Sequence, residues 1–382
     1  MHLRRTAAAA LAAFSTLLIA ASPSPSPSPS HAAAPAALYG DADPTYDGVW
    51  RQSYALLALH AADTEPAGDA VEWLAKQQCA DGGFASYRPD PAVPCDPKTE
   101  DTNATAIAVQ ALAVHGQDFA VKRAAEWLAK VQNRDGGWSY NPGGASDADS
   151  TGVVVGGLKA AGTDVKSVTT DGRSPYDALR SLQLACGKKD GGAFAYQPDA
   201  KSGALVANAK ATTDAVRAVE GAGFVVEAPD RDVPVRSECG GSASDAGAAW
   251  LGARLAAGGG HFDAVTPGSD QKTPDFGTTA DAVIALAAGG HLDAAKGAYN
   301  WLAANSAAWA KDNPTALAQL ALAAYATGNP MRDHVTRLTA LGPVAQQKPD
   351  SSGGGSVWWI VGAGLVAGIG IGVLLAGRKH RL

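Results

Sequence analysis

The sequence has little that would recognise a nucleic acid. Its 31 Lys and Arg residues are outnumbered by 37 Asp and Glu residues, the formal net charge is -6, and no dense basic block occurs outside the two ends of the chain. Proteins that bind nucleic acids normally carry a basic patch or stripe that neutralises phosphates. The composition therefore excludes nucleic acid as a partner.

Cysteine is also scarce, and its spacing argues against a metal site. The four cysteines are Cys79, Cys95, Cys186 and Cys239; none occurs in a Cys-x-x-Cys pair, and the histidines show no ligand spacing. A zinc site built from them would want closely spaced ligands. Two disulfides are expected instead, with three possible pairings, in an oxidising compartment. We predict that sequence neighbours pair, because Cys79 and Cys95 bracket one Pro-rich loop, and we expect neither a metal nor a cofactor.

The two ends of the chain differ in composition from its middle. Residues 1–34 contain two arginines, an apolar run and an alternating Ser-Pro tract, which is typical of a secretory signal peptide followed by a spacer. Residues 346–356 form a Gly/Ser linker before the uncharged apolar segment 357–376, which is long enough to span about 30 Å of hydrocarbon as a helix. The basic tail 377–382 predicts a cytoplasmic C-terminus by the positive-inside rule. We therefore expect a single-pass protein of the cell membrane, with the domain 39–345 outside the cell.

The middle of the chain is rich in two alternating kinds of repeated segment. AAEWLAKVQNRDGGWSY, from Ala124 to Tyr140, resembles AVEWLAKQQCADGGFASY from Ala70 and, more loosely, ALRSLQLACGKKDGGAFAY from Ala178. Between these amphipathic strings lie segments such as DTNATAIAVQALA at Asp101, which begin with a capping residue and continue with small and apolar residues on more than one side. The second kind predicts helices that are buried nearly all round.

Counting these segments predicts the architecture. Buried inner helices are expected to start near residues 46, 101, 148, 208, 275 and 313, and amphipathic outer helices near residues 66, 118, 175, 244, 292 and 329. Six pairs can close into a ring, and the terminal pairs are as apolar as the rest, whereas an open solenoid carries polar caps. We predict an all-α fold, an (α/α)6 toroid with six inner and six outer helices, followed by a single C-terminal transmembrane helix.

The Asp-Gly-Gly-aromatic strings are expected to be joints and not active sites. Glycine allows positive φ where the chain leaves an outer helix, and the following aromatic residue can turn back to pack between helix pairs. The glycines concerned are Gly82, Gly83, Gly136, Gly137, Gly191 and Gly192, and the aromatic residues are Phe84, Trp138 and Phe194.

The string W-L-x3-Q-x2-D-G-G-W, from Trp127 to Trp138, resembles the QW-type repeat of the terpenoid cyclase and protein prenyltransferase superfamily, with similarity over roughly residues 46–341. The resemblance implies the toroid fold. It does not choose a function, because the superfamily also includes thioester domains and the cobalamin carriers intrinsic factor and transcobalamin.

The enzymatic branches make demands that the sequence meets only in part. Protonating cyclases carry an Asp-x-Asp-Asp string, in which one carboxylic acid is held protonated. Here Asp147-Ala-Asp149 is followed by Ser150, so Asp147 and Asp149 are the candidate catalytic residues if the protein is an enzyme. A prenyltransferase needs zinc ligands and a basic diphosphate pocket, and a thioester domain needs Gly-Cys-Gly-Glu-Gln; the sequence contains neither.

Polar residues at the starts of the inner helices suggest a binding site. Parallel inner helices place their N-terminal ends at one rim, where capping is the ordinary role of each residue. Their convergence above an apolar barrel would suit a bulky ligand that carries many amides. The candidate ligand-binding residues are Asp47, Asp101, Thr102, Asn103, Asp147, Asp149, Asn208, Asp275 and Asn313.

A corrinoid is the first candidate for this ligand. The segment at Asp101 is similar to inner helices of intrinsic factor and transcobalamin, with matches at Asp101, Thr102, Ala106 and Ala108. Those carriers clamp the corrinoid with a second small β domain, and none fits between Leu341 and Val357, so a partner chain would have to supply the lid. The leading hypothesis is thus a membrane-anchored extracellular protein that captures a bulky ligand for a transporter. The alternatives are a cyclase-like enzyme acting on a lipid or isoprenoid, and an adhesive surface module that binds another protein.

Overall fold

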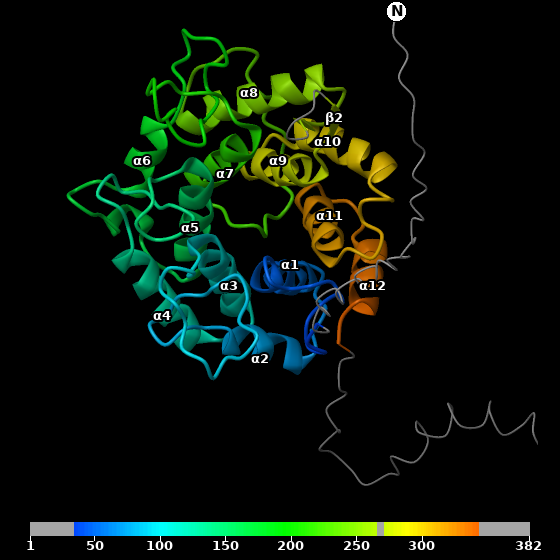
Figure 1. The fold of residues 1–382 in the computed structure, drawn as a ribbon. Helices are drawn as coiled ribbons and strands as arrows, with labels where there is room; N and C mark the ends of the chain where they lie inside the picture. Colours follow the sequence, from blue (N-terminus) through cyan, green and yellow to red (C-terminus); the bar gives the residue numbers. More distant parts are fainter. Residues whose placement is uncertain (1–33, 266–270, 344–382) are drawn as a thin grey trace, which may run out of the picture.

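The computed structural model describes residues 34–265 and 271–343, which form a ring of helices around a common axis (Figure 1). The inner layer consists of α1 (Gly48–Ala61), α3 (Thr102–Val114), α5 (Ala148–Ala160), α7 (Ala209–Val219), α9 (Phe276–Ala288) and α11 (Pro314–Ala326). The outer layer consists of α2 (Gly68–Lys76), α4 (Asp118–Lys130), α6 (Pro175–Ser181), α8 (Ala243–Ala257), α10 (Leu292–Asn305) and α12 (Arg332–Ala340). Each helix begins within three residues of its predicted start.

The ring is closed, as the sequence predicts. Each inner helix packs against the next along the chain, and α11 packs against α1. The inner helices are buried nearly all round: in α9 every residue from Thr278 to Ala287 is buried, as is every residue from Ala316 to Ala324 in α11. Their burial against two inner neighbours and the outer layer places the hydrophobic core between the two layers.

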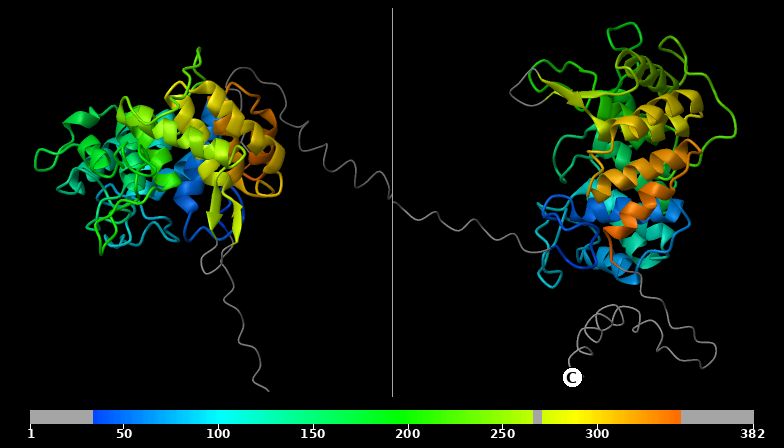
Figure 2. Two further views of the ribbon diagram at one scale, coloured as in Figure 1. Left: turned by 90° about the horizontal axis from the view of Figure 1, so that it is seen from above. Right: turned by 90° about the vertical axis from the view of Figure 1, so that its right-hand side faces the viewer.

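Short elements complete the described part of the chain. The helix η1 (Val165–Ser167) precedes α6, and the strands β1 (Asp263–Val265) and β2 (Lys272–Pro274) pair antiparallel, with Asp263 opposite Pro274. This two-stranded ribbon projects from the ring beside α8 and α10 (Figure 2).

The predicted linker, membrane segment and basic tail all lie outside the described residues, as do the predicted signal peptide and spacer up to residue 33. Among the helices of residues 34–265 and 271–343, none combines the length and the apolar character needed to cross a bilayer. The transmembrane part of the predicted architecture therefore has no support from the structure.

The Asp-Gly-Gly strings are joints, as expected, but only one glycine of each pair has a positive φ. Gly82, Gly136 and Gly192 have φ values of 112°, 88° and 90°. A Cβ atom at these positions would lie within 2.4 Å of a backbone carbonyl oxygen of the next outer helix or its N-cap, belonging to Arg123, Ser174 and Ala246 respectively. Each joint therefore needs glycine both for its backbone conformation and for a close approach.

The other glycines of these strings were predicted wrongly to need positive φ. Gly83 and Gly137 are required for space, because a Cβ on Gly83 would come within 2.6 Å of the Trp127 ring and a Cβ on Gly137 within 2.8 Å of Ser146. In the third joint the register shifts by one residue, so that Asp190 has a φ of 57° and Gly191 does not have a positive φ.

The aromatic residues of the joints pack as predicted. Phe84, Trp138 and Phe194 are completely buried. Trp127 is 3% exposed, and its indole Nε1 donates a hydrogen bond to Asp81 Oδ2 of the preceding joint at 3.1 Å. The cysteines pair as sequence neighbours, Cys79 with Cys95 and Cys186 with Cys239, which confirms the predicted disulfides.

Candidate active site

A pocket of about 220 Å³, which we call the rim pocket, opens at the N-terminal ends of α1, α3, α5 and α7. Its wall combines aromatic, acidic and basic side chains. The lining residues are Tyr46, Asp47, Trp50, Ser86, Asp101, Asn103, Ala104, Tyr140, Asp149 and Lys210. Other pockets of the described chain are larger, but they lie on the outside of the ring or between helix pairs, away from the axis where the inner helices converge.

The structure brings four of the predicted rim residues together in this pocket, namely Asp47, Asp101, Asn103 and Asp149. Asp47 is the residue before α1, and its carboxylate lies 3.5 Å from the Arg51 guanidinium. Asp101 caps α3 by accepting hydrogen bonds from the backbone N–H groups of Asn103 and Ala104 at 2.7 and 2.9 Å. One oxygen of Asp101 also accepts a hydrogen bond from Ser86 Oγ.

The other predicted rim residues lie outside the pocket lining and hold the fold together. Asp147 is fully buried and accepts hydrogen bonds from the backbone N and the Oγ of Ser150. Asn208, Asp275 and Asn313 cap α7, α9 and α11 in the same way. Thr102 Oγ donates to the Ser139 carbonyl oxygen at 2.8 Å, which ties α3 to the following joint. Of the two candidate catalytic residues, only Asp149 therefore faces the pocket.

Asp149 stands at the floor of the pocket, on the first turn of α5, with its side chain 25% exposed. Lys210 Nζ of α7 lies 3.3 Å from Asp149 Oδ1. Lys210 Nζ also forms an ion pair with Asp214, so the carboxyl groups of Asp149 and Asp214 approach the same ammonium group. Two neighbouring carboxyl groups repel each other when both are ionised, which favours a proton on one of them, as in the paired carboxyls of acid-base enzymes.

A polar cluster of largely buried side chains adjoins the pocket and shares Lys210 with it. Lys210 forms ion pairs with Asp214 on its own helix and, at 3.4 Å, with Asp281 of α9. Arg217 Nη2 donates to Asp214 Oδ1 at 2.6 Å, and its guanidinium lies over the Phe224 ring at 4.0 Å. Asp281 also accepts hydrogen bonds from the Tyr54 hydroxyl of α1 and from Gln319 Nε2 of α11. The cluster thus connects four of the inner helices.

These surroundings shift the pKa values of the carboxyl groups in opposite directions. Burial raises the pKa of Asp149 well above its ordinary value; Lys210 opposes this shift, and Asp214 adds to it. Although burial alone would raise it, Lys210 and Arg217 hold the pKa of Asp214 below its ordinary value. A proton is therefore held more readily by Asp149, the carboxyl that faces the pocket, than by Asp214, which favours a carboxylic acid beside a carboxylate.

The charged residues of the cluster, Lys210, Asp214, Arg217 and Asp281, were not predicted from the sequence. Lys210, Asp214 and Arg217 are spaced so that they share one face of α7, and Asp281 interrupts the apolar run of α9. Charged residues inside helices that are otherwise buried all round were the available signal, because a buried charge must be paired.

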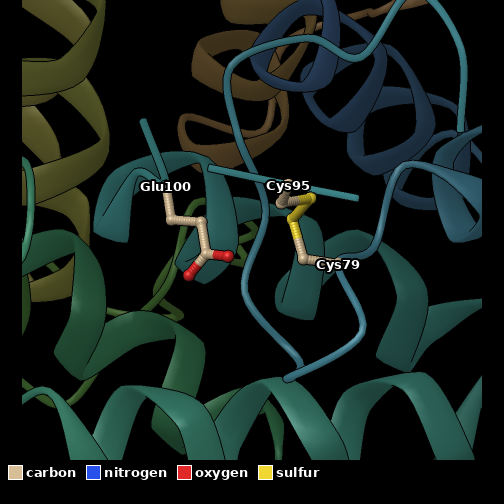
Figure 3. A group of neighbouring side chains, drawn as sticks. All are labelled: Cys79, Cys95 and Glu100. Atoms are coloured by element: carbon tan, nitrogen blue, oxygen red, sulfur yellow. A yellow bond between two sulfur atoms is a disulfide. The ribbon is translucent and has the colours of Figure 1, made fainter. Parts of the chain in front are cut away.

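One grouping of potential metal ligands occurs among the described residues, formed by Cys79, Cys95 and Glu100 (Figure 3). The two sulfur atoms are bonded to each other at 1.96 Å. A disulfide has no thiolate to offer a metal ion, and thiolate is the form in which cysteine binds zinc. This grouping therefore does not fit a metal ion.

Comparison with known proteins agrees with the fold. Residues 50–209 match the family described as the prenyltransferase alpha-alpha toroid domain. The squalene–hopene cyclase of Alicyclobacillus acidocaldarius is 31% identical over 144 residues, which are 32% of this chain and 22% of the cyclase. The chain thus matches less than a quarter of the length of that relative.

Solved structures resemble the chain at low identity. The ent-copalyl diphosphate synthase from Streptomyces platensis has a TM-score of 0.48 and 18% identity, covering 73% of this chain and 50% of the synthase. The type II terpene cyclase MstE from Scytonema has a TM-score of 0.41 and 16% identity, covering 69% of this chain and 68% of the cyclase. At such identities and scores we draw no chemical conclusion from the likeness.

Proposed function

The chain belongs to the terpenoid cyclase and prenyltransferase superfamily of α/α toroids, and we propose that its toroid is an enzyme that protonates a compact, largely apolar substrate of the isoprenoid class. The observation that carries the proposal is the Asp149 carboxyl group, which lines the rim pocket, has a raised pKa and approaches the same Lys210 ammonium group as Asp214. A neutral acid at the floor of a pocket is the group that proton donation to an alkene requires.

In the proposed reaction, Asp149 transfers its proton to a carbon–carbon double bond of the substrate. The carboxylate that remains is stabilised by Lys210, whose Nζ lies 3.3 Å away and whose charge is held by the surrounding carboxylates. The carbocation formed in the substrate would lie near the aromatic rings of Trp50 and Tyr140, which line the same pocket, and aromatic faces stabilise a neighbouring cation. Loss of a proton from the cation to water or to a rim carboxylate would complete an isomerisation or cyclisation.

The size of the pocket limits the substrate. Pockets that enclose drug-sized ligands have volumes of about 300–1,000 Å³. The rim pocket measures about 220 Å³, and Lys210, which lines it, is paired with the fully buried Asp214. We therefore propose a short isoprenoid as substrate in preference to a long polyprene.

The corrinoid carrier, which was the leading prediction from the sequence, gains no support. A corrinoid is much larger than the rim pocket and would have to rest on the rim instead of entering the ring. Five of the nine predicted contact residues lie outside the pocket lining, where they cap helices or tie them to loops. Capture of a bulky ligand, with a lid protein and a transporter as partners, is therefore the second candidate.

The test of the proposed function is turnover in deuterated water. The purified protein would be incubated with geraniol, farnesol and their diphosphates, and products would be analysed by mass spectrometry for deuterium bound to carbon. We expect deuterated product from at least one substrate and a loss of about 100-fold or more in Asp149→Asn, because general acid catalysis contributes about 10²–10⁴-fold. Asp275→Asn, which alters a helix cap outside the pocket, is the matched control and should retain activity.

We further propose that the toroid lies outside the cell on a single membrane anchor, as the terminal segments of the sequence predict. Protease added to intact cells should then release the domain by cutting the Gly/Ser linker at residues 346–356. Complete protection of the protein in intact cells would contradict this location.

A further inference from the structure

A second pocket, of about 440 Å³, lies between α7, α8 and the β1–β2 ribbon, apart from the rim pocket. The rings of Trp250 and Phe262 line it and are stacked with their centroids 6.4 Å apart. Arg254 and Lys272 also line the pocket. Within the described part of the chain neither cation has a carboxylate partner; the Arg254 guanidinium instead lies 5.6 Å from the centre of the Trp250 ring.

The internal repeat of the chain supplies a reference for this pocket. Asp101, the cap of α3, donates its backbone N–H to the Phe84 carbonyl at 2.8 Å, and Asn208, the cap of α7, donates to the Phe194 carbonyl at 3.0 Å. On the outer layer, Trp127 Nε1 donates to Asp81, and Trp250 Nε1 donates to Asp190 at 3.2 Å. The surroundings of Trp127 and Trp250 are therefore equivalent parts of two repeats.

The two repeats differ in the residue that precedes the helix cap. In the first repeat this residue is Glu100, which pairs with Ala85 in an isolated antiparallel bridge; in the other it is Ala207, which pairs with Ala195 in the same manner. Glu100 is 2% exposed, and its carboxyl group lies beside the Trp127 ring, since a Cβ on Gly83 would come within 2.9 Å of Glu100 Oε2 and within 2.6 Å of that ring. Burial, together with Asp81, raises the pKa of Glu100 to about 7.

Ala207 has only a methyl group at the position where Glu100 has a carboxyl group beside Trp127. The second pocket opens at this place, since Ala207, Trp250 and Asp190 all line it. The space that one repeat fills with its own carboxyl side chain is thus open in the other. Arg254 and Lys272 stand beside it without a carboxylate partner among the described residues. The two acidic residues of the lining, Asp190 and Asp263, are bonded to Trp250 and His261.

From this difference we infer that the pocket beside Trp250 binds a carboxylate ligand with a planar apolar body, whose carboxylate takes the place that Glu100 takes in the first repeat. Arg254 would provide the counter-charge, and the stacked rings of Trp250 and Phe262 would contact the body of the ligand. This inference does not depend on the proposed acid chemistry, because no residue that lines this pocket also lines the rim pocket.

The test uses benzoate as the probe and benzamide as its neutral counterpart of the same shape. Each would be titrated into the purified protein, with binding followed by calorimetry and by tryptophan fluorescence. We expect benzoate to bind at least about tenfold more tightly than benzamide. In Arg254→Gln the affinity for benzoate should fall about tenfold, the lower end of what a charged hydrogen bond contributes, because Arg254 is exposed.

The decisive variant is Ala207→Glu, which restores the side chain of the first repeat. Its carboxylate should occupy the pocket and abolish benzoate binding while the far-UV spectrum and the melting temperature stay at or above those of the wild type. Three results would overturn the inference. The first is equal affinity for benzoate and benzamide, and the second is no benzoate binding at 10 mM, which corresponds to a binding free energy of roughly 3 kcal/mol. The third is unchanged benzoate binding in folded Ala207→Glu. If Ala207→Glu does not fold, the test rests on Arg254→Gln. An affinity of Arg254→Gln for benzoate equal to that of the wild type would then overturn the inference.

Discussion

The carboxyl groups of Asp149 and Asp214, which belong to the neighbouring inner helices α5 and α7, approach the same ammonium group, that of Lys210. Asp214 is held ionised by Lys210 and by Arg217, whose Nη2 lies 2.6 Å from its Oδ1. A proton is therefore held more readily by Asp149, whose pKa is raised and which is the partner that lines the pocket. A ring closed by parallel helices can bring such groups together from positions 65 residues apart in sequence.

The balance of charge in the cluster predicts the effect of removing a distant carboxylate. Three carboxyl groups, those of Asp149, Asp214 and Asp281, surround the two cations Lys210 and Arg217. Asp281→Asn removes one negative charge that faces Lys210, so Lys210 will stabilise the Asp149 carboxylate more strongly and the pKa of Asp149 will fall.

The pH profile of Asp281→Asn provides the measurement. Activity requires protonated Asp149, whose pKa is raised in the folded protein, so activity is full at low pH and falls as the pH rises through that pKa. In Asp281→Asn this alkaline limb should move to lower pH. Gln319→Leu removes a hydrogen bond from Asp281 without changing the charge, and it should leave the limb in place. Identical profiles of Asp281→Asn and wild type would exclude Asp281 from this role.

Packing of the repeat is tested at Trp127. The side chain is 3% exposed, its ring lies against Gly83, and its indole N–H is bonded to Asp81. Trp127→Ala should lower the free energy of unfolding by about 3–5 kcal/mol, as expected for a large buried aromatic residue. Urea denaturation gives the value, and Trp73→Ala, at the equivalent but more exposed position of α2, should lose less. A loss below about 0.5 kcal/mol for Trp127→Ala would be incompatible with its place in the core.

The two disulfides should differ in their contribution to stability. Cys186 and Cys239 are 53 residues apart in the sequence, and Cys79 and Cys95 are 16 apart. The loop-entropy relation gives about 4 kcal/mol for the longer loop and about 3 kcal/mol for the shorter. Double replacement by alanine, followed by denaturation of each variant, should therefore destabilise the protein more at Cys186 and Cys239. The opposite order would mean that loop length does not govern their effect.

Much of the fold could be predicted because its signals are local. Capping residues such as Asp101 and Asn313 mark helix starts, and the Asp-Gly-Gly strings mark the joints, so the helices and their order follow from short stretches of chain. The choice of a positive φ at Gly192 and not at Gly191 could not be predicted, because it depends on how closely that joint approaches Ala246.

The site was predictable only in part, because it depends on contacts between helices that are far apart in the sequence. Asp149 was found from a partial motif, but the motif gave Asp147 equal standing, and only the three-dimensional arrangement separates the buried helix cap from the group at the pocket. The convergence of Lys210, Asp214 and Asp281 depends on the closure of the ring, which sets which faces of α5, α7 and α9 meet at the axis. A periodic pattern of apolar residues shows which face of a helix is buried, but not which other helix that face contacts.

The most direct test of Asp149 as the proton donor is its protonation state, which can be measured without a substrate. Infrared difference spectra between the wild type and Asp149→Asn would be recorded from about pH 4 to pH 8, following the stretching band of the protonated carboxyl group. An ordinary aspartic acid, with a pKa of about 3.9, is ionised at about pH 6. The account predicts that the protonated band of Asp149 persists at that pH and is missing in Asp149→Asn. An Asp149 that is fully ionised at about pH 6 would contradict it.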